Sequence, residues 1–173
     1  MEHTFHTTPL GVVASRPFLD KPDTAHAKPG LYHIELRLGT AEASSLIADI
    51  DRRLEEYIED RKRNAKVLGA TALAPSPYTL DGDSVTFAFK LSAGTRTGLR
   101  PQDPPVIYDA TANPTTDIRI IRGAHVRVSF QFAPYHSNLF GAGMKLKLAA
   151  VQGMAKFAPA RQLAGTPSHG FAP

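Results

Sequence analysis

The stretch that decides the fold is RGAHVRVSFQFAPYHSNLFGAGMKLKLAAVQG, residues 122–153. It reads as two strands joined by a loop, because apolar residues occupy every second position on either side of residues 133–143. The apolar sets are Val126, Val128, Phe130 and Phe132, then Met144, Leu146 and Leu148. Such alternation is typical of antiparallel strands that bury one face and expose the other. The stretch therefore predicts a β-hairpin in a mainly β protein.

The outward face of this hairpin is cationic. Arg127 lies on that face of the first strand, and Lys145 and Lys147 lie on that of the second. The loop adds two aromatic residues, Tyr135 and Phe140. A solvated sheet face, with the rings folded back over the sheet, is one interpretation. The other is a surface for a single strand of nucleic acid, whose phosphates need cations and whose bases stack on rings.

The rest of the chain predicts more strands and one helix. Strands are expected at residues 10–19, 31–39, 84–91 and 118–123, with a turn at DKPD, residues 20–23. Thr40 is a plausible helix N-cap with Glu42 in the first turn, and the helix should end within residues 60–69. Roughly five to seven strands and one helix predict an OB-fold-like antiparallel β-barrel with a capping α-helix.

Length and charge narrow the class of protein. A chain of 173 residues is of the usual size for one domain. Without cysteine, disulfides and thiolate metal sites are excluded. Residues 1–83 carry net charge −3 and residues 84–173 carry +7, which makes the stated +4. A basic second half favours a polyanionic partner. We see no leader or membrane-spanning pattern, so we expect a protein that stays in the compartment where it is made.

Further binding residues are expected outside the hairpin. Lys90 lies on the outward face of the strand at 84–91, opposite its core-facing residues, and Arg37 lies on the polar side of the strand at 31–39. The segment 93–117 is long for a connection inside a compact domain, which favours a functional loop. It contributes Arg96, Arg100 and Tyr108. The scattered histidines and the acid pairs of the helix match no metal or catalytic spacing, so we expect no metal, no cofactor and no enzyme.

Five segments occur in an order that resembles a known family. They are FLDKPDTAHAKPGLYHIELRL, DGDSVTFAFK, RP with VIYDATAN, RGAHVRVSFQFAPY and GAGMKLKLAAVQG. Together they resemble the OB-fold single-stranded DNA-binding proteins of tailed bacteriophages, of the podophage replication type. The resemblance covers residues 11–153. It implies sequence-independent coating of single-stranded DNA in phage replication, recombination and repair, in the cytoplasm of the infected bacterium. Phage replication proteins are implied as partners, and a homodimer is left open.

The C-terminal segment departs from that family. Podophage-type members end in an acidic tail with a terminal aromatic residue, whereas residues 156–173 contain Lys156 and Arg161 and no acid. Residues 156–173 also show no periodicity and contain several Pro and Gly residues, so we expect a domain at residues 1–155 followed by a flexible tail. Without acidic residues, we do not expect this tail to have the family's tail function. Two rival functions stay open at this point. One is a β-barrel virion or scaffold protein that docks an acidic partner through its basic face, and the other is a small enzyme that uses the histidines.

Overall fold

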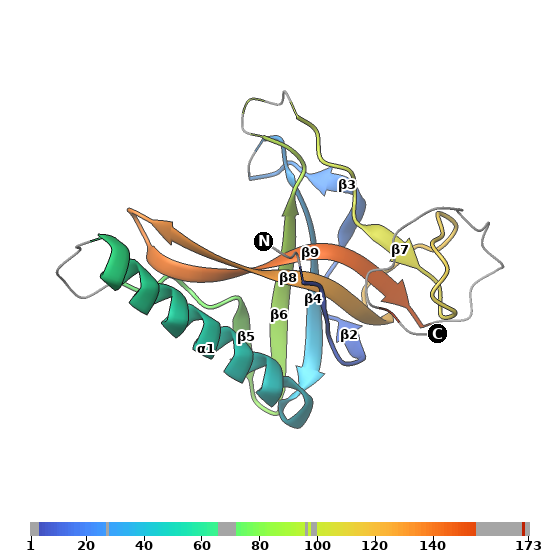
Figure 1. Cartoon of the computed structure of the whole chain (residues 1–173). Helices are drawn as coiled ribbons and strands as arrows, with labels where there is room; N and C mark the ends of the chain where they lie inside the picture. Colours follow the sequence, from blue (N-terminus) through green and yellow to red (C-terminus); the bar gives the residue numbers. More distant parts are fainter. Residues whose placement is uncertain are drawn as a thin grey trace.

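The computed structural model describes residues 4–26, 28–65, 72–95, 97, 100–154 and 171. A twisted barrel carries one long helix along its side, and a long hairpin extends from the barrel over that helix (Figure 1). The nine strands of the described part are β1 (His6–Thr7), β2 (Gly11–Val13), β3 (Phe18–Asp23), β4 (Leu31–Gly39), β5 (Tyr78–Asp81), β6 (Ser84–Ser92), β7 (Val106–Tyr108), β8 (His125–Ser137) and β9 (Gly141–Gly153). The helix is α1 (Thr40–Ala65).

Five of these strands close into a barrel. The hydrogen-bonded order β8-β2-β4-β6-β9 returns to β8, because β8 also pairs with β9. Strands β1, β3, β5 and β7 extend the barrel by pairing with β8, β4, β6 and β9. Most pairings are antiparallel, but β6 and β7 each run parallel to β9. The mainly β barrel with one α-helix that the sequence predicts is confirmed.

Alternation along the strands places the core inside this barrel. Ile34 and Leu36 of β4, Phe87 and Phe89 of β6, and Phe130 of β8 are at most 1% exposed. The rings of Phe89 and Phe130 lie 5.2 Å apart, tilted against each other. Burying each such side chain stabilises the fold by about 1.5–3 kcal/mol. The residues between them in sequence point outward, and these form the surface of interest.

The N-cap of helix α1 is Gly39, one residue before the predicted N-cap Thr40. The Gly39 backbone N–H donates to Glu42 Oε2 at 3.2 Å, which is half of a capping box with Gly39 at the N-cap position. The Thr40 hydroxyl instead donates to the Asp83 carbonyl oxygen at 2.7 Å. Ala43 and Ile50 are buried in the core, so the helix closes one side of the barrel. Among the described residues, no helix is both long enough and apolar enough to cross a lipid bilayer.

Three local predictions are wrong. DKPD is not a turn, because these residues form most of β3. The expected strand at residues 10–19 is split into β2 and the start of β3. Residues 118–123 form no strand, although Ile118 and Ile120 are buried. The two isoleucines pack into the core from an irregular segment. Because no described strand pairs with this segment, the sequence shows the alternation of a strand where the backbone makes no strand hydrogen bonds.

The hairpin turn is shorter than the predicted loop. Strands β8 and β9 pair from Val126↔Gly153 to Ser137↔Gly141, which leaves residues 138–140 as the turn. Gly141 has φ of 82°. A Cβ atom there would overlap the carbonyl oxygen of Ala72, to which the Ala142 backbone N–H donates at 2.8 Å. Gly141 thus lets residues 72–74 pair with the turn end of the hairpin.

We expect Gly141→Ala to lower the free energy of unfolding by more than the roughly 1–2 kcal/mol that a left-handed backbone costs a non-glycine residue. The extra loss comes from the overlap with Ala72. Denaturant titration measures the difference. Gly82→Ala is the matched control, since Gly82 also has positive φ, 56°, but a Cβ atom there meets nothing within 4 Å. Equal losses in both variants would contradict the role given to Ala72.

Candidate nucleic-acid interface

Three lysines meet on the outer face of the barrel where β6 and β9 lie side by side. Lys90 of β6 is the register partner of Lys147 of β9. Lys145 lies two residues before Lys147 and therefore faces the same way. All three side chains are exposed. The predicted sharing of one face by Lys145 and Lys147 is confirmed, and barrel closure brings Lys90 to them.

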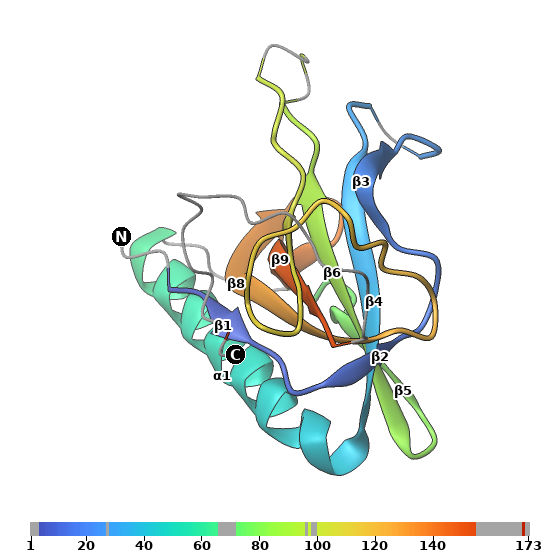
Figure 2. The same ribbon diagram turned by 90° about the vertical axis from the view of Figure 1, so that its right-hand side faces the viewer.

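Two adjoining hollows surround these lysines, and together we call them the lysine groove. The larger hollow has a volume of about 830 Å³ and includes all three lysines and Arg100. Arg100 comes from the loop after β6, which rises beyond the end of the barrel (Figure 2). Polar groups of Ser92, Thr95 and Gln102 complete that end. Among the described lining residues of both hollows, the charged side chains are all cationic.

The second hollow holds the aromatic rings. Its volume is about 340 Å³, and Tyr135, Phe140 and Met144 line it together with Lys90 and Lys145. Phe140 lies in the hairpin turn and is 60% exposed. Tyr135 is half-buried and lies on β8 rather than in the predicted loop, opposite Gly143. A Cβ atom at Gly143 would come within 2.7 Å of the Tyr135 ring, so glycine lets the ring lie close over β9.

Tyr135 and Lys145 also contact each other directly. The Lys145 Nζ lies 4.7 Å from the centroid of the Tyr135 ring, which is within the range of a cation–π interaction. This contact holds an ammonium group beside a ring. A phosphate and its neighbouring base can therefore be bound at adjacent points of the groove.

The prediction that Arg127 shares one surface with Lys145 and Lys147 is wrong, because Arg127 lies away from this groove, as does Arg37. Arg127 pairs with Gln152, four residues along β8 from the partner of Lys147, which is about 13 Å of strand. Between them the register shifts by one residue at Ser129, and Ser129 and Gln152 are fully buried. Gln152 Nε2 donates to the Asp109 carbonyl oxygen at 3.2 Å, so the segment after β7 covers this end of the outer face. Arg37 lines a different hollow, with His125 and Glu42.

Tyr108, which the sequence predicts as a stacking ring, is buried. The ring of Tyr108 is only 3% exposed and packs edge to face on Phe171 at 5.2 Å, so it does not offer a face to a base. Burial also raises the pKa of its hydroxyl. Arg96 and, in the expected flexible tail, residues 156–170, 172 and 173 lie outside the described residues. Within the described part of the chain, no three His, Asp or Glu side chains converge as metal ligands would.

The structure adds residues that the sequence did not single out. Phe18 of β3 is the register partner of His33 of β4, and His33 is the partner of Lys90. One row of outward side chains therefore runs from Phe18 to Lys147 across four strands. The outward position of His33 is visible in the alternation of residues 31–39, but its neighbours across the sheet are not. The sequence predicts antiparallel pairing of the strands at residues 10–19 and 31–39, and both β2 and β3 do pair antiparallel with β4. It does not predict that β3 continues through DKPD, because those residues resemble a turn.

This barrel, with five strands closed through the parallel β6–β9 pair and a cationic groove on its outer face, has the OB-fold. It is similar to gp2.5, the single-stranded DNA-binding protein encoded by bacteriophage T7, with a TM-score of 0.73, 21% identity, and coverage of 92% of this chain and 96% of that one. It is also similar to the single-stranded DNA-binding protein of bacteriophage Enc34 in complex with single-stranded DNA, with a TM-score of 0.58, 17% identity, and coverage of 91% and 90%.

The similarity is detected in structure rather than in sequence. No family model and no curated protein matches the chain. At identities of 21% and 17%, the two phage structures show the shared fold. The OB-fold that the sequence predicts is thereby confirmed, and the resemblance to phage single-stranded DNA-binding proteins holds at the level of the whole fold.

Proposed function

We propose that this protein binds single-stranded DNA without sequence preference, through the lysine groove. The observation that carries the proposal is the composition of the groove. Among the described residues, four cations, two aromatic rings and no carboxylate line its two hollows. Phosphates bind to such cations whatever the sequence, and every base has a face that can stack on a ring. The OB-fold shared with two phage single-stranded DNA-binding proteins supports the same function.

The proposed role is binding without catalysis, in the cytoplasm of an infected bacterium, where the protein coats single strands during phage replication, recombination and repair. Phage replication proteins are the proposed protein partners. What supports this setting is the source of the structurally similar proteins, which are encoded by bacteriophages.

Titration of a fluorescent oligo(dT) with the full chain at several salt concentrations tests the proposal. For four phosphates neutralised in the groove, the logarithm of the affinity should fall with the logarithm of the salt concentration with a slope near −3, since each phosphate contributes about −0.7. The affinity should be similar for oligo(dT) and mixed-sequence oligonucleotides. Absence of binding at about 50 mM salt would reject the proposal.

Duplex DNA and RNA of the same length are the comparison ligands. A single strand should bind more tightly than duplex DNA, because only unpaired bases expose faces to Tyr135 and Phe140. Equal affinity for single-stranded and duplex DNA would indicate that the groove binds polyanions in general and does not recognise unpaired bases. Binding of an acidic protein, with no affinity for any oligonucleotide, would favour the virion or scaffold function instead.

A further inference from the structure

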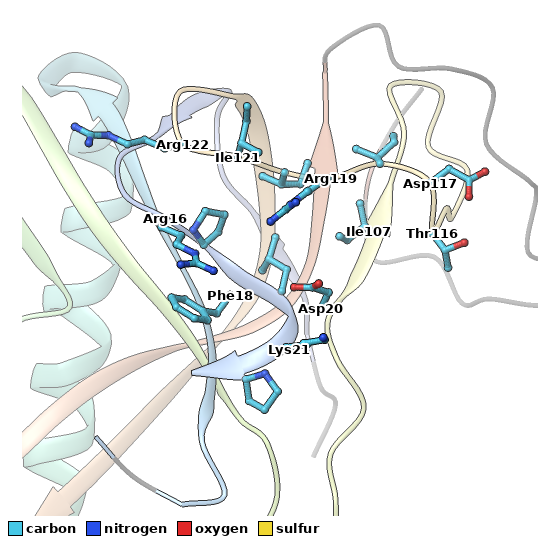
Figure 3. A pocket seen from close by; sticks show the side chains of 15 residues that line it. Arg16, Phe18, Asp20, Lys21, Ile107, Thr116, Asp117, Arg119, Ile121 and Arg122 are labelled. Atoms are coloured by element: carbon cyan, nitrogen blue, oxygen red, sulfur yellow. The ribbon is translucent and has the colours of Figure 1, made fainter. Parts of the chain in front are cut away.

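A second basic cleft lies beyond β4, on the far side of β3 from the lysine groove. Its volume is about 870 Å³, and none of its lining residues belongs to the lysine groove. One wall is β3 with Arg16 and Pro17 before it, and the other is the irregular segment of residues 116–122. Figure 3 shows Arg16 and Phe18 on the β3 side and Arg119 extending toward them from the opposite segment. We call this space the arginine cleft.

The described lining of the arginine cleft carries more cations than carboxylates. Its lining includes four cations, Arg16, Lys21, Arg119 and Arg122, and two carboxylates, Asp20 and Asp117. All four cations are exposed. Within the described part of the chain, the ion pairs are His33 with Asp23, and Arg52 with Asp49 and Glu56, so none of these four cations takes part in one. Guanidinium groups that are free in this way are suited to bind phosphate oxygens.

An aromatic pair stands between this cleft and the lysine groove. The rings of Phe18 and His33 lie 4.9 Å apart and are tilted by 33°. The guanidinium carbon of Arg16 also lies 5.1 Å from the centroid of the Phe18 ring. His33 Nε2 is 3.3 Å from Asp23 Oδ2, which holds the imidazole in place. Phe18 is half-buried, so part of its ring is open to a ligand.

Strand register connects the two basic sites through this pair. Phe18 is opposite His33, His33 is opposite Lys90, and Lys90 is opposite Lys147. Neighbouring strands are spaced by about 4.8 Å, so the row from Phe18 to Lys147 spans about 14 Å across the outer face. A few nucleotides of an extended strand cover that distance. The row therefore joins the cations of the lysine groove to those of the arginine cleft.

We propose that the arginine cleft is a second phosphate-binding site for the same single strand, which leaves the lysine groove, crosses β4 over the Phe18–His33 pair and reaches Arg16 and Arg119. This proposal rests on the proposed function. It assigns the protein a longer binding site than the lysine groove alone provides. It also predicts that binding strength depends on oligonucleotide length in a way that the two arginines control.

The test compares two oligo(dT) probes, one of about 5 nucleotides that fits the lysine groove and one of about 20 nucleotides that reaches the cleft. The variant is Arg16→Ala combined with Arg119→Ala in the full chain. At about 0.1 M salt it should bind the long probe roughly 25-fold more weakly, with a salt slope shallower by about 1.4, because two phosphates lose their partners. Its affinity for the short probe should equal that of the unmodified protein.

Controls separate the possible outcomes. Arg16→Lys with Arg119→Lys keeps the charge and should retain most of the affinity for the long probe. Arg52→Ala removes a cation that is ion-paired on the surface of α1 and should change neither probe's affinity. Circular dichroism during heating shows whether each variant folds.

Three results would overturn the proposal. The first is an unchanged affinity of the arginine variant for the long probe. The second is an equal loss of affinity for both probes. The third is that the variant no longer binds poly-glutamate, an acidic polypeptide, while its affinity for the long probe is unchanged. The last result would assign the cleft to an acidic protein. If the unmodified protein binds neither probe, the proposed function itself fails, and that outcome is distinct from all three.

Discussion

Replacing Lys90, Lys145 and Lys147 together with alanine is expected to weaken binding of a short oligo(dT) by roughly 500-fold at about 50 mM salt. A phosphate that has lost its lysine partner keeps its condensed counterions when the DNA binds. Each such loss lowers the affinity about 8-fold at that salt concentration. The three lysines lie on one face around the β6–β9 contact, so one strand of DNA would contact all of them. Anisotropy titrations at several salt concentrations should also show a slope shallower by about 2.

Two control variants make this result specific to charge in the groove. The triple replacement of the same lysines by arginine keeps the cations and should retain most of the affinity. Arg52→Ala should leave binding unchanged, because Arg52 lies on α1 with Asp49 and Glu56 as partners. The alanine variant should unfold at the same temperature as the unmodified protein or a higher one, since three like charges are removed from one surface. A loss of affinity below about 5-fold would place the DNA elsewhere on the protein.

The sequence predicted those parts of the site that depend on the alternation within one strand. Lys145 and Lys147 share a face because side chains two residues apart in a strand point the same way, and no other part of the chain is needed to decide this. The same rule placed Phe87, Phe89 and Phe130 in the core. Strand period and helix period are local properties, so they can be read before the fold is known.

The parts that were missed depend on which strands become neighbours. Lys90 is among the predicted binding residues, but its position beside Lys147 follows only from the parallel pairing of β6 and β9 when the barrel closes. Arg127 is separated from the lysines by the register shift at Ser129 and by the segment after β7. Tyr108 is buried by its own packing on Phe171. Each of these contacts joins residues far apart in sequence, and a single sequence carries no signal for them.

Replacing both Tyr135 and Phe140 with alanine is expected to weaken binding by at least about 30-fold while leaving the salt slope unchanged. Stacking of one base on an aromatic ring contributes about 1–3 kcal/mol, so two rings contribute about 2–6 kcal/mol, and each 1.4 kcal/mol is a factor of ten. The rings carry no charge, so no counterions are involved in their loss. The unchanged slope distinguishes this variant from the lysine variant.

Leu139→Ala is the matched control for the ring variant. Leu139 is next to Phe140 in the hairpin turn and is 87% exposed, but it has no aromatic face. If stacking causes the loss, Leu139→Ala should leave the affinity for DNA unchanged. If the turn makes only a general apolar contact with DNA, Leu139→Ala should weaken binding as much as Phe140→Ala does.

The chain has five tyrosines and no tryptophan, so tyrosine fluorescence gives a second readout. Single-stranded DNA should quench the tyrosine fluorescence of the unmodified protein. It should quench the fluorescence of Tyr135→Phe less, because the base then stacks on a ring that does not emit in the tyrosine band. Equal quenching in both would place the bases away from Tyr135.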